Sequence, residues 1–240
     1  RGGILARATG TGGAEQVVPA RLTVDLLRPT LIEPLEVRTT VRRDGRRIRL
    51  VDAEVVQNDV VVSRASAMFL RRGEHPAGDI WSSPVVMPPL PSDPGPLPED
   101  LMMFVWGGYG GETASPAARW PSPNGTTPPA PKYAWIRQVR PLVEGEVTTP
   151  FVTVAMAADA ASATSHWGGT EGLRYINADY TLTLAREPVG GVHRVGGHLA
   201  QQPRGHRLRC GGGVRRAGGA DRKRDHRRLV NPAESFHPRA

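Results

Sequence analysis

The first part of the chain alternates apolar and polar residues with the period of a β-strand. Leu22, Val24 and Leu26 occupy every second position, with polar residues between them. That alternation is typical of a strand with one buried face. The same pattern returns in residues 35–41, 48–55 and 60–71. Residues 21–72 therefore predict an antiparallel meander of four strands.

Two polar dipeptides are expected to turn the chain within this meander. Asp44-Gly45 supplies residues that accept the positive φ of a tight hairpin, and Asn58-Asp59 supplies the next turn. Ahead of the strands, residues 3–18 contain two alanine-bearing apolar stretches that favour a helix. Three glycines interrupt them, and each costs about 1 kcal/mol in a helix interior. We expect a short helix there.

A proline-rich segment separates this region from a second set of elements. Residues 73–131 contain 14 of the 23 prolines, which prevents regular strand ladders and predicts an extended linker. Its apolar stretch at 101–111 includes Phe104, Trp106 and Tyr109, which we expect to pack against a domain or a partner rather than bind a cofactor. A strand, an alanine-rich helix and an alternating strand then follow at 133–136, 151–167 and 173–184.

The last fifty residues differ in composition from the rest. Residues 191–240 hold 12 Lys and Arg against 3 Asp and Glu, which leaves 19 Lys and Arg against 20 Asp and Glu before them. The net charge of +8 therefore resides in this tail. The tail has no sustained apolar periodicity, so we expect it to be disordered or aberrant.

Two explanations of the tail remain open. Residues 191–228 could be translated out of frame, or they could form a genuine basic arm that binds nucleic acid through its phosphates. The arginines are not interleaved with aromatic residues, so the arm lacks a surface on which bases could stack. Nucleic acid is the less favoured partner.

Several classes of chemistry have no signal in the sequence. The single cysteine, Cys210, allows no internal disulfide. No His and Cys spacing suits a metal, no Gly-x-Ser-x-Gly elbow supplies a nucleophile, and no phosphate-binding loop occurs. No apolar run reaches the roughly 18 residues of a membrane span. We expect a cytoplasmic protein without a membrane span, metal or cofactor.

Four sequence stretches carry a resemblance to a known family. They are RLTVDLLRP at 21–29, VRRDGRRIRLVDAEVV at 41–56, PLVEGE at 141–146 and GLRYINADYTLTL at 172–184. They resemble double-hotdog proteins like the type II acyl-CoA thioesterases and their actinobacterial relatives. The resemblance implies an α+β fold in which two helices are each wrapped by a curved antiparallel sheet.

The resemblance also implies a domain organisation. Residues 1–72 would form an N-terminal hotdog with a truncated start, and 73–131 would be a linker. Residues 132–190 would form a C-terminal hotdog whose sheet is incomplete, and 191–240 would be the basic tail. Such units commonly pair their sheets, so we expect a homo-oligomer.

The implied activity is the hydrolysis of a fatty acyl-CoA to a free fatty acid and CoA. In this family a carboxylate on the helix, helped by hydroxyl or amide side chains, activates a water that attacks the thioester. The carboxylate position falls on Asp159. The water-holding position falls on Asn177, where the family usually has threonine. A third position, a glutamine on the last strand, would lie in the tail.

Less specific readings of these residues stay open. Asp159 could be an ordinary helix carboxylate, exposed or bonded to His166 or Ser162. The arginines of RRDGRR could meet the CoA phosphates, although a hairpin tip is more often a solvated charge cluster. The alternative function is a non-catalytic acyl-thioester-binding or structural relative, inactive because of the altered C-terminus.

Overall fold

The protein is described here from a computed structural model. It describes residues 1–10, 17–73, 93, 95–97, 99, 101–109, 132–159, 161 and 175–188, and the backbone of 192–199, 209–215 and 223–230.

The first half of the molecule is one helix followed by four strands. The order is α1 (Gly2–Gly10), β1 (Val17–Leu26), β2 (Glu36–Asp44), β3 (Ile48–Gln57) and β4 (Val60–Arg71). The second half holds β5 (Met103–Tyr109), β6 (Lys132–Gln138), α2 (Pro150–Asp159), β7 (Tyr175–Asn177), β8 (Asp179–Thr183), β9 (Val192–Leu199), β10 (Arg209–Arg215) and β11 (Lys223–Val230).

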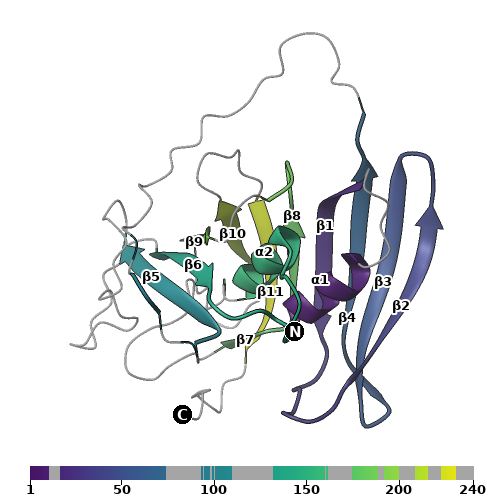
Figure 1. Ribbon diagram of the computed structural model, residues 1–240, viewed down its shortest axis with the longest axis horizontal. Helices are drawn as coiled ribbons and strands as arrows, with labels where there is room; N and C mark the ends of the chain where they lie inside the picture. Colours follow the sequence, from purple (N-terminus) through teal and green to yellow (C-terminus); the bar gives the residue numbers. More distant parts are fainter. Residues whose placement is uncertain are drawn as a thin grey trace.

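The strands form two sheets that share one segment. The orders are β2-β3-β4-β1-β8 and β5-β6-β9-β10-β11-β7. Since β7 and β8 are separated only by Ala178, the segment 175–183 belongs to both sheets and joins them into one layer. Figure 1 shows α1 and α2 next to each other, with β1 to β4 on one side and the second sheet on the other. This is the predicted α+β double hotdog.

Strands β1 and β8 join the two halves in a symmetric way. Residues 20–28, ARLTVDLLR, align with residues 178–186, ADYTLTLAR. The two strands run antiparallel with Thr23 opposite Thr181, which are equivalent positions in that alignment. The two strands therefore pair about a local two-fold axis through these threonines.

Backbone hydrogen bonds outside the strands repeat the same symmetry. The Leu26 N–H donates to the Ala178 carbonyl at 2.7 Å, and the Leu184 N–H donates to the Ala20 carbonyl at 2.8 Å. Each bond is the symmetry mate of the other in the alignment of 20–28 with 178–186. The two halves of the fold thus repeat each other down to individual backbone hydrogen bonds.

Most of the core lies between the helices and the first sheet. Leu22, Val24, Tyr180 and Leu182 are fully or almost fully buried in one cluster with both helices. The residues of α2 from 151 to 158 are all buried, as expected of a helix that is apolar all round. Burial of this kind provides most of the free energy that holds the two halves together.

The two predicted turns have different geometries. Asn58 and Asp59 have φ values of 51° and 59°, as a two-residue hairpin turn requires. Gly45 does not have positive φ, because residues 45–47 make a longer loop that the Gly45 N–H closes by donating to the Ile48 carbonyl at 3.0 Å. The expectation of positive φ at Asp44-Gly45 was wrong.

The structure also departs from the predicted domain organisation. Strand β5, inside the expected linker 73–131, pairs with β6, and buried Trp106 contacts the Tyr133 and Trp135 cluster. The predicted packing of Phe104 is seen as well, whereas the Tyr109 side chain lies outside the described residues.

The tail contains strands where disorder and an incomplete sheet were expected. The backbones of β9, β10 and β11 pair with each other and connect β6 to β7. Ladder hydrogen bonds join main-chain groups, so they do not require the side-chain alternation on which the prediction relied. The rest of 191–240 lies outside the described residues.

Candidate functional site

Asp159 is the last residue of α2 and the first acidic side chain along it. The preceding helix residues are buried against both sheets, whereas the Asp159 side chain is one third exposed. Its Oδ2 lies 3.5 Å from the backbone nitrogen of Arg1, at the beginning of α1. Asp159 is therefore at the edge of the core, where its carboxylate is accessible to a bound molecule.

Asn177 ends β7 and lies beside the end of α2. Its Nδ2 donates to the backbone carbonyl of Asp159 at 3.3 Å. Its Oδ1 is buried and has no hydrogen-bond partner among the described residues. The two residues predicted from the sequence are thus neighbours, although 18 positions separate them.

The pair has the groups needed to hold a water molecule. An ionised carboxylate accepts a proton, and a free amide oxygen accepts a hydrogen bond from water. A buried acceptor without a partner is costly, so a water is expected to satisfy Asn177 Oδ1. His166, Ser162 and the predicted glutamine position lie outside the described residues or side chains.

A cavity of about 290 Å³ lies at the opposite end of the helix pair. It is bounded by the end of α1, the beginning of α2, and the segment 142–149 between β6 and α2. Apolar groups line much of it, including Val17, Phe69, Leu142 and Phe151. Sequence reasoning did not predict this cavity.

An ion pair bridges one side of the cavity. Arg7 Nε donates to Glu146 Oε2 at 2.6 Å, and its Nη2 contacts Oε1 at 2.5 Å. The hydrogen bond from Arg7 holds the pKa of Glu146 below its ordinary value of 4.5, and the same bond raises the pKa of Arg7. The pair links α1 to the segment before α2.

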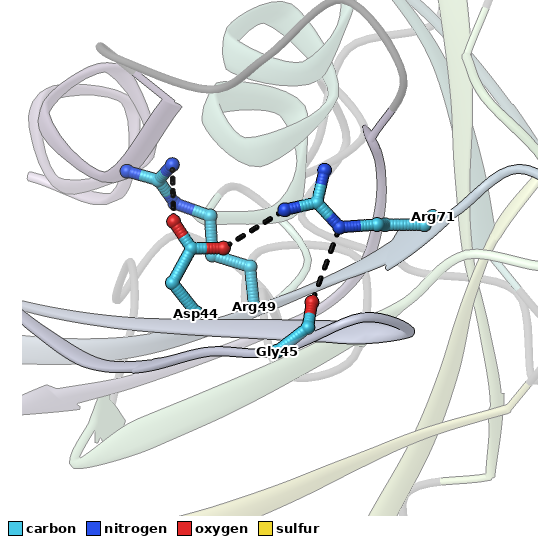
Figure 2. Close-up of polar contacts among 4 residues, drawn as sticks. All are labelled: Asp44, Gly45, Arg49 and Arg71. Atoms are coloured by element: carbon cyan, nitrogen blue, oxygen red, sulfur yellow. Dashed lines mark hydrogen bonds and ion pairs between the residues drawn. The ribbon is translucent and has the colours of Figure 1, made fainter.

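Arg49 also lines the cavity and comes from the β2–β3 hairpin. As Figure 2 shows, its Nη1 donates to Asp44 Oδ2 at 3.4 Å, while Arg71 Nη2 donates to Asp44 Oδ1 at 3.0 Å. Arg71 Nε also donates to the Gly45 carbonyl at 3.1 Å. Two arginines therefore share one carboxylate.

Arg49 is largely buried, and one of its donors lacks a partner. The side chain is 13% exposed, and among the described residues Nε has no hydrogen-bond partner. The sequence held a signal for this placement. Arg49 continues the odd-numbered series of Val51, Ala53 and Val55, the inward face of β3.

Two features are absent from the described residues. No group of His, Cys, Asp and Glu in this part of the chain is arranged to hold a metal ion. No helix in the same residues is long and apolar enough to cross a bilayer.

The sequence and the structure were compared with known proteins. A family model described as the acyl-CoA thioesterase N-terminal domain matches residues 2–70. No curated protein matches the sequence.

Solved structures match over nearly the whole chain. Acyl-CoA thioesterase II TesB2 from Mycobacterium marinum is 16% identical with a TM-score of 0.63, covering 98% of this chain and 89% of its own. A putative thioesterase II from Thermobifida fusca is 15% identical with a TM-score of 0.64, covering 95% and 84%. A hot dog fold protein of unknown function from Alicyclobacillus acidocaldarius is 18% identical with a TM-score of 0.61, covering 99% and 86%.

The class of protein follows from the fold. The chain is a double-hotdog protein, with a duplicated helix and sheet in a single polypeptide. Within this fold, residues 2–70 match the N-terminal domain of acyl-CoA thioesterases.

Proposed function

We propose that the protein hydrolyses a fatty acyl-CoA to a free fatty acid and CoA. The observation that carries this proposal is the meeting of Asp159 and Asn177 at the end of α2. One residue carries a partly exposed carboxylate and its neighbour carries an unsatisfied amide oxygen, in a fold whose relatives include an acyl-CoA thioesterase II.

The proposed reaction uses water as the nucleophile. Asn177 Oδ1 accepts a hydrogen bond from the water, and the Asp159 carboxylate removes its proton as the oxygen attacks the thioester carbon. The tetrahedral intermediate collapses with cleavage of the carbon–sulfur bond. The thiolate of CoA leaves and takes up a proton, and the carboxylic acid is released.

The proposal also covers the acyl-chain site, the oligomeric state and the compartment of the enzyme. The acyl chain would lie in a tunnel beside α2, since that helix presents an apolar surface next to Asp159. We propose a homo-oligomer in the cytoplasm, in keeping with the sequence expectation.

The runner-up is an acyl-thioester-binding relative without catalysis. One contact favours it: Asn177 Nδ2 is bonded to the Asp159 carbonyl, so the asparagine also fastens β7 to α2. In a non-catalytic relative the asparagine would have only this structural role, and the protein would release no thiol from any acyl-CoA.

Thiol release from acyl-CoAs of increasing chain length separates the two. We expect Asp159→Asn to abolish release, and Asn177→Ala to lower the rate by about a hundredfold, within the usual range for general-base machinery. Glu146→Gln, at the far end of α2, is the matched control and should retain the rate. Release that survives in Asp159→Asn would contradict the proposal.

A further inference from the structure

The two helices can be aligned position by position, like the two strands. Residues 4–10, ILARATG, match residues 153–159, TVAMAAD, with alanines in common at two positions. In this register Gly10 is the equivalent of Asp159. In the strand alignment, Pro19 is the equivalent of Asn177. The first half therefore has its own counterpart of the proposed catalytic pair.

The cavity occupies that counterpart site. Gly10 and Pro19 both line it, and so does Pro150. Pro150 is the helix equivalent of Arg1, whose backbone nitrogen contacts Asp159 in the other site. Three positions, from one helix alignment and one strand alignment, therefore place the cavity where the local two-fold axis would carry the Asp159 site.

The counterpart site cannot activate water in the same way. Glycine supplies no carboxylate, and proline supplies no side-chain amide. Among the described residues, a Cβ built on Gly10 would meet no atom within 4 Å, so these residues leave open space at that position. This space is bounded by apolar groups from both helices and from β1 and β4.

The charges around the cavity leave a positive surplus. Arg7 is paired with Glu146, and Arg72 with Glu187. Asp44 is shared by Arg49 and Arg71, so that trio carries one uncompensated positive charge. Arg49 lines the cavity with a side chain that is 13% exposed, so a carboxylate bound there could balance this charge.

We propose that this cavity binds a fatty carboxylate and does not hydrolyse anything. The alkyl chain lies against Val17, Phe69 and Phe151, and the carboxylate accepts hydrogen bonds from Arg49. A volume of about 290 Å³ is at the lower end of the roughly 300–1,000 Å³ of small-molecule sites, which suits one medium-length chain. The inference rests on the proposed function only in using Asp159 and Asn177 to mark the equivalent site.

Calorimetric titration of decanoate into the Asp159→Asn protein tests this proposal without turnover. We expect saturable decanoate binding in the cavity, separate from any binding in the proposed acyl tunnel beside α2. Arg49→Met should weaken decanoate binding by about tenfold to a hundredfold, the cost of one charge-assisted hydrogen bond. The same variant should bind decanol as the parent does, within about twofold. Gly10→Phe should abolish binding of both ligands by filling the cavity.

The controls separate this proposal from loss of fold and from loss of catalysis. Thermal unfolding of each variant establishes that it is folded, and Arg49→Lys replaces Arg49→Met if the latter is not. No saturable site, an equal loss of decanoate and decanol in the Arg49 variant, or unchanged binding in Gly10→Phe would each overturn the proposal. Decanoate binding in the cavity, together with no thiol release from acyl-CoA by the unsubstituted protein, would overturn the proposed thioesterase function and leave this proposal standing.

Discussion

Thr23 and Thr181 face each other across the junction of the two halves, with their hydroxyl oxygens 3.2 Å apart and 158 positions between them in the sequence. They are equivalent positions of the two aligned halves, so each threonine meets its own counterpart. This places the local two-fold axis of the fold at a contact between two side chains. The axis relates the Asp159 site to the cavity.

The threonine contact predicts non-additive stabilities. Thr23→Val should lower the free energy of unfolding by about 0.5–1.5 kcal/mol, because one hydroxyl loses its partner. Adding Thr181→Val should cost little more, since replacing both partners with apolar groups of the same shape leaves neither unsatisfied. Urea unfolding of the two single variants and the double variant measures this coupling. Fully additive losses would contradict it.

The first turn of α1 predicts a strong preference for glycine at one position. A Cβ at Gly2 would overlap the Tyr180 hydroxyl and lie 2.8 Å from its Cζ. Tyr180 is buried and its hydroxyl donates to the Ala155 carbonyl at 3.4 Å, so it cannot move away freely. Gly2→Ala should therefore destabilise by about 1–3 kcal/mol, as overpacking does.

Two other glycines of α1 serve as controls in the same thermal-unfolding series. Gly3→Ala should cost less than Gly2→Ala, because its Cβ meets the flexible side chain of Met156 at 2.5 Å. Gly10→Ala should be neutral or stabilising, because no atom of the described residues lies within 4 Å of the added Cβ and alanine favours the helix. If Gly10→Ala lowered the stability more than Gly2→Ala, α1 would pack against Tyr180 in a different way from the one described.

The shared layer predicts that the two halves unfold together. Leu22, in β1, lies opposite Leu182 in β8, and both are almost fully buried. Leu22→Ala should cost about 2–5 kcal/mol. All five tryptophans lie beyond residue 72, so their fluorescence reports the second half alone. In Leu22→Ala, the unfolding transitions followed by tryptophan fluorescence and by far-ultraviolet circular dichroism should both move to lower stability. A fluorescence transition that stays where it is in the parent protein would show that the two halves unfold independently.

The ion pair beside the cavity predicts a pH effect of known sign. The hydrogen bond from Arg7 lowers the pKa of Glu146 in the folded protein, so the pair stabilises the fold above the ordinary value of 4.5. That contribution disappears as the pH falls through the lowered pKa. Because both side chains are exposed, the effect should be small and weakened by salt.

Nuclear magnetic resonance titration of the Glu146 carboxyl carbon checks this prediction. The pKa should lie below 4.5 and return toward that value in Arg7→Met. A Glu146 pKa that does not respond to the loss of Arg7 would show that the pair does not persist in solution.

The sequence predicted the first half well because its strands bury one face. Leu22 and Val24 are buried as their alternation requires, and Asn58-Asp59 turns with positive φ. The second half was harder to predict, since β9 to β11 are held by main-chain bonds in a segment rich in glycine and arginine. A side-chain pattern carries no signal for such strands.

The candidate site was only partly visible in the sequence. Asp159 and Asn177 came from a family resemblance, and their contact depends on the packing of α2 against β7. The cavity could not be read from residue types, because its defining positions are a glycine and a proline. Arg49 could have been found, since an arginine on the inward face of a strand needs a partner.

A single turnover in ¹⁸O-labelled water tests the central claim most directly. Excess enzyme is mixed with decanoyl-CoA, and the released acid and the peptide containing Asp159 are analysed by mass spectrometry. Attack by water held between Asp159 and Asn177 predicts stoichiometric thiol release, one ¹⁸O atom in the decanoic acid and none in Asp159. No thiol release, or ¹⁸O in the Asp159 carboxylate, would contradict the account.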